Sequence, residues 1–262
     1  MISDKVAIVT GGGQGIGSSI SQALLAKGYQ VIIAQRGEPD AALAHATWLA
    51  TDLTDDHACT QLIDVAIKKH GRLDALINNA GIMLESPNTT PPQDDDSAVA
   101  TQTIRDAMTQ FDRTLAINLR APYLLSLLAL PHLSASLGCI VNIGSIEGQA
   151  SNPRHSAYGA SKAALHALTR GLAVDHGQTV RCNAIAPGWI DTTLNDAFIA
   201  SMPDPARFRA SLGEIHPSGR TGTADEVAAL VVFLCSDNAS FINGQTITID
   251  GGRTAQLSLP SR

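Results

Sequence analysis

Short apolar runs, rich in valine and isoleucine, alternate along this chain with longer segments of helical periodicity. Seven such runs lie at residues 6–9, 31–34, 47–50, 75–77, 139–143, 180–185 and 246–249. Continuous apolar runs of this length are typical of strands covered on both faces. Their alternation with helices predicts right-handed βαβ units, with a parallel sheet between two layers of helices.

The predicted helices occupy residues 16–27, 55–70, 111–133, 157–176 and 224–236. Gly28 and Gly71 follow the first two, at the position where glycine commonly ends a helix. No internal repeat or linker interrupts the pattern, so residues 1–262 are predicted to form a single domain.

Two proline-containing segments depart from the alternation. Residues 85–100 include three consecutive aspartates and lack periodicity, which predicts an enlarged surface loop. Residues 193–220 are predicted to form a substrate-side loop around a short helix. Residues 85–100 fit a tolerated surface insertion as well as a substrate-facing role. Because long loops in compact domains commonly act as lids or binding loops, we expect the segment to shield part of a substrate entrance.

Composition excludes several classes of protein. The chain has 18 Lys+Arg against 24 Asp+Glu, a net charge of −6 and no basic run, which argues against nucleic-acid or anionic-membrane partners. No apolar stretch approaches the ~20 residues of a membrane span, and the N-terminus is predicted to form a strand, not a signal peptide. The four separated cysteines are predicted to be buried free thiols, and no His/Cys cluster indicates a metal site. We therefore expect a cytoplasmic protein.

A glycine-rich turn, with Gly11, Gly15 and Gly17, connects the first predicted strand to the first helix. Glycines there let backbone N–H groups approach a pyrophosphate at a helix N-terminus. The strict Gly-x-Gly-x-x-Gly spacing is not met, so the turn alone also fits a flexible loop. Its place between strand and helix favours a dinucleotide site.

Tyr158 and Lys162 are four residues apart and share one face of a predicted helix. A nearby ammonium stabilises a phenolate, so we expect Lys162 to lower the pKa of Tyr158 and make it an acid/base. Ser145 follows a strand at the sheet edge where open α/β folds bind ligands. Residues 159–163, Gly-Ala-Ser-Lys-Ala, nearly copy the nucleophile elbow of serine hydrolases, but they are predicted to lie inside a helix.

The order and spacing of these motifs resemble the short-chain dehydrogenases/reductases. The resemblance runs from Lys5 to Gly252 and includes Gly11-x-x-x-Gly15-x-Gly17, Asn78-Asn79-Ala80-Gly81, Asn118, Ser145, Tyr158-x-x-x-Lys162, Pro187-Gly188 and Asp250-Gly251-Gly252. It implies a Rossmann-type, doubly wound α/β fold with a seven-stranded, mostly parallel sheet. It also implies an NAD(P)-dependent oxidoreductase that transfers a hydride between a nicotinamide cofactor and a secondary alcohol or ketone.

The resemblance also implies a role for each matched residue. The implied catalytic residues are Asn118, Ser145, Tyr158 and Lys162, of which Lys162 also grips the nicotinamide ribose and Asn118 holds a water that links to the lysine. The implied cofactor contacts are Gly11, Gln14, Gly15, Ile16, Gly17, Arg36, Asp52, Leu53, Asn79, Tyr158, Lys162, Gly188, Ile190 and Thr192. The implied substrate contacts are Ser145, Glu147, Tyr158 and Trp189.

Residues after the second predicted strand bear on the choice of cofactor. An acidic side chain there accepts the ribose 2′-OH of NAD(H), whereas arginine accommodates the 2′-phosphate of NADP(H). This chain has neutral Gln35 followed by Arg36, so NADP(H) is favoured over NAD(H). NAD(H) stays open because Gln14 stands where many NADP-preferring relatives carry a basic residue, and Glu38 can reach the ribose if its loop folds inward.

Other functions on this scaffold are a catalytically idle NAD(P)-binding sensor or scaffold, and chemistry such as dehydration or epimerisation. A sensor needs no acid/base pair, so the four implied catalytic residues favour the enzyme. The resemblance further implies a homotetramer that uses helices 111–133 and 157–176 with the last helix and strand. Leucines encircle the first of these helices, which indicates burial on more than one side.

Overall fold

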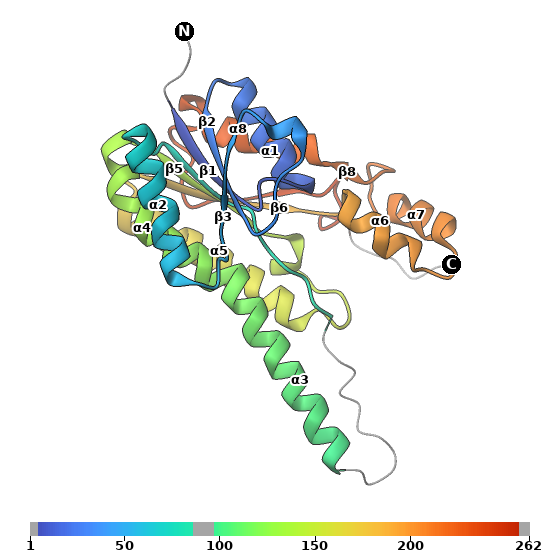
Figure 1. Cartoon of the computed structure of the whole chain (residues 1–262). Helices are drawn as coiled ribbons and strands as arrows, with labels where there is room; N and C mark the ends of the chain where they lie inside the picture. The colour runs from blue at the N-terminus through green and yellow to red at the C-terminus, as the bar shows by residue number, and fades with distance from the viewer. Residues whose placement is uncertain (1–4, 86–96, 257–262) are drawn as a thin grey trace.

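Seven parallel strands form one sheet through the middle of the molecule (Figure 1). They are β1 (Val6–Thr10), β2 (Gln30–Gln35), β3 (Thr47–Ala50), β4 (Ala75–Asn78), β5 (Cys139–Ile143), β6 (Arg181–Pro187) and β9 (Thr246–Ile249). Their spatial order is β3-β2-β1-β4-β5-β6-β9. Strands β2 and β3 are added on one side of β1, and β4 to β9 on the other, so the strand order switches direction between β1 and β4. Open sheets of this kind bind ligands at the carboxyl ends of the strands near that point. The computed structural model, which describes residues 5–85 and 97–256, confirms the predicted doubly wound fold.

Helices cover both faces of the sheet. One face carries α1 (Gly15–Ala26) and α8 (Ala224–Leu234), and the other carries α2 (Asp56–His70), α4 (Ala121–Ser136) and α5 (Ser156–His176). Short helical turns are η1 (Ala41–Leu43), η3 (Ile146–Gly148) and η4 (Asp237–Ala239). The predicted ends of α1, α2, α5 and α8 agree with the structure within about two residues, whereas the predicted helix 111–133 spans the end of α3, a short turn and most of α4.

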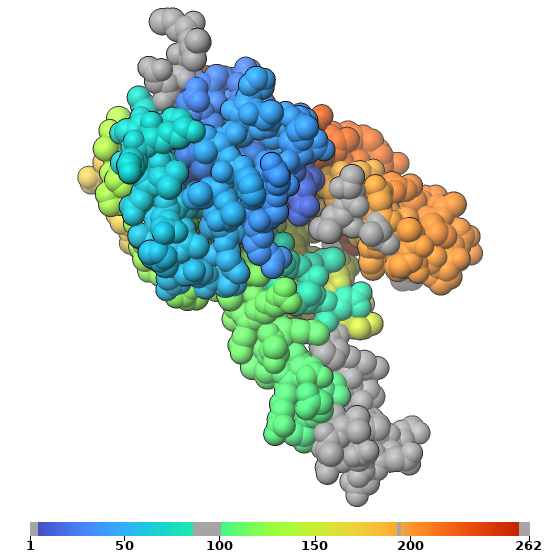
Figure 2. Space-filling model, in the orientation of Figure 1, coloured from blue at the N-terminus to red at the C-terminus, as the bar shows by residue number. Residues whose placement is uncertain are grey.

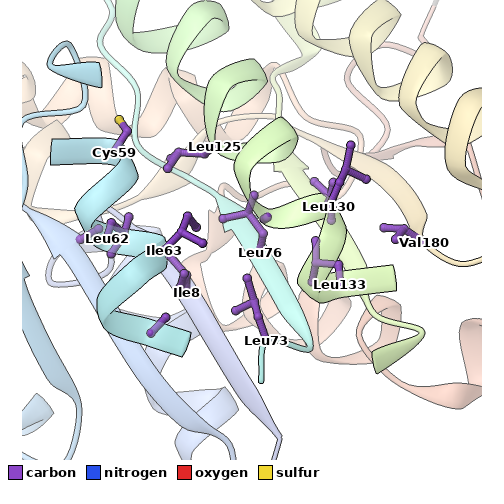
Figure 3. Packing of buried hydrophobic residues seen from close by; sticks show 14 of the residues in the cluster. Ile8, Cys59, Leu62, Ile63, Leu73, Leu76, Leu125, Leu130, Leu133 and Val180 are labelled. Carbon is purple, nitrogen blue, oxygen red and sulfur yellow. The ribbon is translucent and has the colours of Figure 1, made fainter. Parts of the chain in front are cut away.

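The apolar core lies against both faces of the sheet. Figure 3 shows one half of it, where Leu62 and Ile63 of α2 point toward Ile8 and Leu76 of the strands. Leu133 of α4 belongs to the same buried cluster. The central strands are buried along their whole length, as the continuous apolar runs predict, and the four cysteines are buried free thiols, also as predicted.

Helix α3 (Ser97–Leu115) begins earlier than the sequence predicts. Residues 97–100 are its first turn, so the expected loop to residue 100 and the helix start at residue 111 are wrong. The prediction failed because α3 projects from the body of the molecule and leaves apolar residues such as Ile104 and Met108 exposed, without the burial that apolar periodicity reports elsewhere. Residues 86–96, the rest of that loop, lie outside the described residues.

A π-helical turn, η2 (Ala116–Arg120), joins α3 to α4, and α3 projects away from the sheet (Figures 1 and 2). Within the described part of the chain, one helix, Thr101–Ser136, is long and apolar enough to cross a membrane by length and composition alone. Core helices pass the same test, and Leu125, Ala129 and Leu133 of this helix are fully buried in the core. The pattern is therefore weak support for a membrane span.

The segment between β6 and α8 forms a projection from the body of the molecule, orange at the right of Figure 2. It contains two helices, α6 (Thr193–Ala200) and α7 (Pro205–Glu214), where the sequence predicts a loop around one short helix. A two-stranded parallel sheet, β7 (Ile190–Asp191) with β8 (Gly222–Thr223), closes its base. The segment thus begins and ends at the carboxyl edge of the main sheet.

Candidate active site

The predicted site residues come together at the carboxyl edge of β1, β4, β5 and β6. The glycine turn after β1 meets Thr192, because a Cβ built on Gly15 would lie 3.4 Å from Thr192 Cγ2. The turn after β4 approaches both η2 and α5, because a Cβ on Gly81 would lie 3.3 Å from both Asn118 Oδ1 and Lys162 Nζ. Residues far apart in the sequence thus surround one region.

The glycine turn is closed by main-chain contacts that side chains would prevent. Gly11 and Gly15 have φ values of 61° and 50°, which favour glycine. A Cβ on Gly17 would collide with the Gly11 carbonyl and lie 2.6 Å from Asn79 Nδ2. Asn79 Nδ2 donates to Thr10 O at 2.9 Å and to Gly11 O at 3.2 Å, and so ties the turn to β4.

The first turn of α1 suits an anion. Gln14 is the N-cap and its side chain makes no capping hydrogen bond, and Ile16 follows in a first turn that carries no acidic residue. Backbone N–H groups at a helix N-terminus lack intrahelical partners and favour phosphate. This cradle, together with the absent Cβ atoms of the turn, fits the pyrophosphate of a dinucleotide.

At the ends of β2 and β3 the side chains that bear on cofactor choice lie near one another. Gln35 Oε1 accepts from the Gly13 N–H at 2.8 Å, and Gln35 Nε2 donates to Gly37 O at 2.9 Å. Arg36 is exposed. Hydrogen bonds from Thr54, with a smaller effect of Arg36, lower the pKa of Asp52. The position that is acidic in NAD-binding sites is therefore neutral here and already hydrogen-bonded; Leu53, the other predicted contact after β3, is buried.

Tyr158, Lys162 and Ser145 are brought together, as the sequence predicts. Lys162 is 3% exposed, its Nζ donates to Ile143 O at 2.8 Å, and it lies 5.7 Å from the centroid of the Tyr158 ring. The Ser145 side chain hydrogen-bonds with that of Tyr158, and Ser145 Oγ accepts from the Glu147 N–H at 3.1 Å. The carboxyl end of β5 and one face of α5 thus form a single polar cluster.

The acid/base properties of this cluster differ from the expectation. Burial raises the pKa of Tyr158 to about 12, with the Ser145 hydrogen bond opposing and the Glu147 carboxylate adding to the shift. Burial also lowers the pKa of Lys162 to about 8. The prediction that Lys162 lowers the Tyr158 pKa is therefore wrong for this structure. The physical reason is that loss of hydration disfavours the phenolate, while the ammonium donates to Ile143 O.

Asn118 is fully buried in the π-turn between α3 and α4. Its Nδ2 donates to Ile82 O at 2.8 Å and to Ser161 Oγ at 3.0 Å, and its Oδ1 accepts from the Ile82 N–H at 2.8 Å. Single π-turns commonly mark functional sites. Ser161 lies inside α5 and donates to Tyr158 O at 2.7 Å, so the strand-to-turn geometry of a nucleophile elbow is absent at this residue.

Beside Tyr158, Glu147 makes contacts that the sequence did not reveal. Its Oε1 accepts from Asn152 Nδ2 at 3.0 Å and its Oε2 lies 2.9 Å from His155 Nδ1. The His155 ring stands edge-on to Tyr158 at a centroid distance of 6.4 Å. Asn152 and His155 belong to an irregular loop without periodicity, so no sequence signal pointed to them.

An aromatic cluster follows the carboxyl end of β6. Trp189 packs against Phe198 of α6 and Phe208 of α7 with ring centroids 6.1 and 6.3 Å away, and the two phenylalanines are 5.8 Å apart. Gly188 allows close passage over Asp250, since its Cβ would lie 2.8 Å from that of Asp250. The Ile190 side chain is buried in the core, which leaves only its main chain for a ligand. Among residues 5–85 and 97–256, no group of three or more His, Cys, Asp or Glu could hold a metal ion.

Comparison with known proteins agrees with this fold and site. The family model described as Enoyl-(Acyl carrier protein) reductase matches residues 11–254. L-fucose dehydrogenase of Bos taurus is 37% identical over 254 residues, covering 95% of this chain and 88% of the relative. Cis-4-hydroxycyclohexanecarboxylate dehydrogenase of Sinomonas cyclohexanicum is 36% identical over 262 residues, covering 96% and 97%. The ligand-free aldohexose dehydrogenase of Thermoplasma acidophilum superposes with a TM-score of 0.88 at 31% identity, covering 100% and 98%.

Fold, site and relatives together define an NAD(P)-dependent oxidoreductase. The chain belongs to the short-chain dehydrogenase/reductase family. Its substrates are small molecules, as the names of its relatives indicate, and family membership favours the enzyme over an idle binding module.

Proposed function

We propose that this enzyme transfers a hydride reversibly between a nicotinamide cofactor and a secondary alcohol or ketone, with Tyr158 as the proton donor and acceptor. The observation that carries the proposal is the convergence of Ser145, Tyr158 and Lys162 beside the glycine turn. Relatives named as dehydrogenases of a sugar and of a hydroxycyclohexanecarboxylate support alcohol oxidation as the reaction class.

The bound nicotinamide supplies or accepts the hydride. In the reductive direction Tyr158 Oη gives its proton to the substrate oxygen while Ser145 Oγ donates a hydrogen bond to the same oxygen. A pKa of about 12 keeps the Tyr158 proton in place at neutral pH, which suits reduction. Oxidation requires the deprotonated tyrosine, so its rate is expected to rise with pH. Asn118 does not touch the reacting atoms in this scheme; its hydrogen bonds to Ile82 and Ser161 hold the turn after β4 against α5.

Binding of the cofactor would use the cradle described above. Gly11, Gly15 and Gly17 let the first turn of α1 approach the pyrophosphate, and Asn79 supports the turn. Lys162, whose Nζ lies at the carboxyl end of β5, would hold the nicotinamide ribose. The remaining contacts carried over from the family are Gln14, Ile16, Asp52, Leu53, Gly188, Ile190 and Thr192.

NADP(H) is the cofactor we favour. Gln35 places no carboxylate near the ribose, and its amide oxygen is already bonded to Gly13. Arg36 is exposed beside it and free of a carboxylate hydrogen bond among the described residues. A guanidinium in that place suits a 2′-phosphate.

For the substrate we propose a pocket between the Ser145–Tyr158 cluster and Trp189. Its aromatic wall would contact an apolar or ring-shaped part of the substrate. Glu147 is held by Asn152 and His155, so we expect it to act on the substrate through this network. Glu85, at the start of the predicted entrance loop, pairs with Arg154 at 3.1 Å, which keeps that end of the loop next to the segment leading into α5.

The test is turnover of NADP(H) and NAD(H) with a panel of secondary alcohols and ketones that includes a sugar, an alicyclic hydroxy acid and a vicinal diol. We expect reduction or oxidation of at least one member, faster with NADP(H). Tight cofactor binding with no turnover across the panel and its extensions would instead indicate the idle sensor or scaffold.

A homotetramer and a cytoplasmic location complete the proposal. A groove of about 440 Å³ runs along α3, η2, α4 and α5, and Tyr123 beside it is 46% exposed. Residues that pack between subunits are exposed in this way when a single chain is considered alone. Four free cysteines suit a reducing compartment. Light scattering at micromolar concentration should give about four times the chain mass, and a monomer would contradict the assembly.

A further inference from the structure

His166 lies on the face of α5 that also carries Tyr158 and Lys162, with a spacing of four residues between successive members. It is 4% exposed, and the mechanism above gives it no part. Its Nε2 is buried without a hydrogen-bond partner among the residues that the structure describes. A buried polar ring so close to the reacting groups calls for a physical reason.

The imidazole lies between two glycines that bracket the Ser145-Ile146-Glu147 segment. A Cβ on Gly144 would collide with His166 Nε2 and lie 2.8 Å from its Cδ2. A Cβ on Gly148 would lie 2.6 Å from Cε1 and 2.8 Å from Nδ1. Only glycine leaves room for the ring at both positions, so the ring packs directly against both ends of the segment that carries the serine.

Hydrogen bonds hold the main chain of this segment and its Glu147 side chain. Lys162 Nζ donates to Ile143 O at 2.8 Å just before it, and the Gly144 N–H donates to Ile185 O at 2.7 Å. Within it, Ser145 Oγ accepts from the Glu147 N–H at 3.1 Å. Between Gly144 and Gly148 the imidazole fills the space that separates this backbone from α5, and it limits how far the backbone can move toward the helix.

The ring is neutral where the enzyme works. Burial, followed by the positive charges of Lys162 and Arg170 on the same helix, lowers the pKa of His166 to about 4. Glu147 is the acidic group of the packed segment, and it is bound to Asn152 and His155. A neutral ring fills the space between the glycines without adding a second cation next to Lys162.

We propose that His166 is a positioning residue, whose ring between Gly144 and Gly148 sets the place of the Ser145 hydroxyl relative to Tyr158. The inference rests on the proposed function, because it acts through the roles of Ser145 and Tyr158. Misplacement by about 1 Å of a group that orients the reaction can lower a rate by about 10²-fold.

The experiment compares His166→Ala, which removes the ring, with His166→Leu, which keeps most of its volume. Leu172→Ala is the matched control, because Leu172 is a buried residue farther along α5 in the core beside α2 and α4. For each variant kcat, KM, cofactor affinity, thermal stability and the pH profile are measured. We expect His166→Ala to lower kcat by about 10²-fold with cofactor affinity within about twofold of wild type, and His166→Leu to restore much of kcat.

The pH profile separates positioning from simple core filling. The Ser145 hydrogen bond opposes the rise in the Tyr158 pKa, so its weakening in His166→Ala should move the Tyr158-dependent limb to higher pH. Leu172→Ala should lower thermal stability and leave kcat and the pH profile unchanged. If His166→Ala does the same as Leu172→Ala, His166 only fills the core and the inference is overturned.

Gly144→Ala reaches the same ring from the other side and decides the matter if His166→Ala does not fold. Alone it should lower kcat as His166→Ala does. Where His166→Ala does fold, the nearest remaining atom to the new methyl in that background is Ile185 O at 3.0 Å, so the double variant should recover activity relative to Gly144→Ala. Normal kcat in Gly144→Ala, or no recovery in the double variant, overturns the inference.

Tyr158→Phe, measured in parallel, distinguishes the two proposals. If it keeps full turnover, the proposed function fails and this inference fails with it. If it is inactive while His166→Ala and Gly144→Ala match wild type, only the inference fails.

Discussion

The glycine turn after β1 and the buried face of α5 lie at the same edge of the sheet, yet they are built in opposite ways. The turn works through its main chain, and a methyl group on Gly17 would already collide with the Gly11 carbonyl. The α5 face works through side chains, since Lys162 is buried there and Tyr158 is half-buried beside it. The turn is thus sensitive to any added atom, whereas α5 is sensitive to the loss of particular chemical groups.

Tyr158→Phe should have the largest effect, because it removes one hydroxyl and leaves the turn intact. General acid/base groups contribute ~10²–10⁴-fold, so we expect kcat to fall by about that factor while cofactor affinity stays within about twofold. Steady-state kinetics and cofactor titration measure the two. Tyr123→Phe, at an exposed tyrosine of α4, is the control and should change neither. Activity of Tyr158→Phe within a few-fold of wild type would contradict the assigned role.

Gly17→Ala should have the opposite pattern to Tyr158→Phe, because it adds an atom to the turn. Its main effect should be weaker cofactor binding. Overpacking of this kind costs about 1–3 kcal/mol, which corresponds to roughly 5- to 150-fold in affinity. Gly171→Ala is the matched control, because a Cβ at Gly171 in α5 would have nothing within 4 Å. It should bind cofactor normally and be slightly more stable, since alanine favours helix. Equal cofactor affinity in Gly17→Ala and wild type would show that the turn is not the phosphate cradle.

Arg36→Ala should weaken NADPH much more than NADH. A hydrogen bond to a charged group contributes roughly 1.5–3 kcal/mol, or about one to two powers of ten in affinity. Arg105→Ala, at an exposed arginine of α3, controls for the change in net charge. Equal loss for both cofactors, or a wild-type preference for NADH, would reject the role of Arg36 and direct attention to Glu38.

Lys162→Met should stabilise the cofactor-free enzyme and remove turnover. Burial lowers the Lys162 pKa from 10.5 to about 8, which amounts to roughly 3 kcal/mol of destabilisation in the charged form. The variant also loses the hydrogen bond to Ile143 O, which offsets about 1 kcal/mol of this stabilisation. Thermal unfolding near neutral pH should therefore favour the variant by about 1–2 kcal/mol.

The pH dependence of that difference has a definite sign. Between pH 8 and 10.5 the unfolded chain binds the Lys162 proton more strongly than the folded enzyme, so wild-type stability rises with pH across this window. The advantage of Lys162→Met should shrink there accordingly. A pH-independent advantage would show that Lys162 keeps its ordinary pKa in the folded enzyme, and one that grows with pH would show that folding raises that pKa.

Phe198→Ala should have the smallest effect, on the aromatic side of the site. It removes two ring contacts, with Trp189 and Phe208, each worth about 0.5–1.5 kcal/mol. Because Phe198 is 37% exposed, we expect a rise of a few-fold in substrate KM and little change in kcat or cofactor affinity. A large fall in kcat would mean that the wall aligns the reacting atoms.

The agreement between prediction and structure differs from region to region for a physical reason. The strands and the helices α1, α2, α5 and α8 were predicted within about two residues, because apolar periodicity reports burial against the sheet. Helix α3 was truncated and the pair α6 and α7 was merged, since these helices project from the body of the molecule and α3 leaves apolar residues such as Ile104 and Met108 exposed.

Within the site, the residues of the sequence motifs could be predicted, whereas the residues that contact them could not. Ser145, Tyr158, Lys162 and Asn118 could be named from order and spacing alone. Asn152, His155 and His166 could not, because their importance depends on contacts made only in the folded chain. Asn152 and His155 bind the Glu147 carboxylate, and the His166 ring packs between two glycines.

The amino-acid sequence by itself determined the parallel sheet, the glycine turn and the helix that carries Tyr158 and Lys162. These follow from local rules of periodicity, turn chemistry and i, i+4 spacing. Only the tertiary structure decided the hydrogen bonds of Glu147, the direction of the Tyr158 pKa shift and the packing of His166 between two glycines. Burial and contact between residues distant in sequence set those properties, and neither is encoded in the neighbourhood of any single residue.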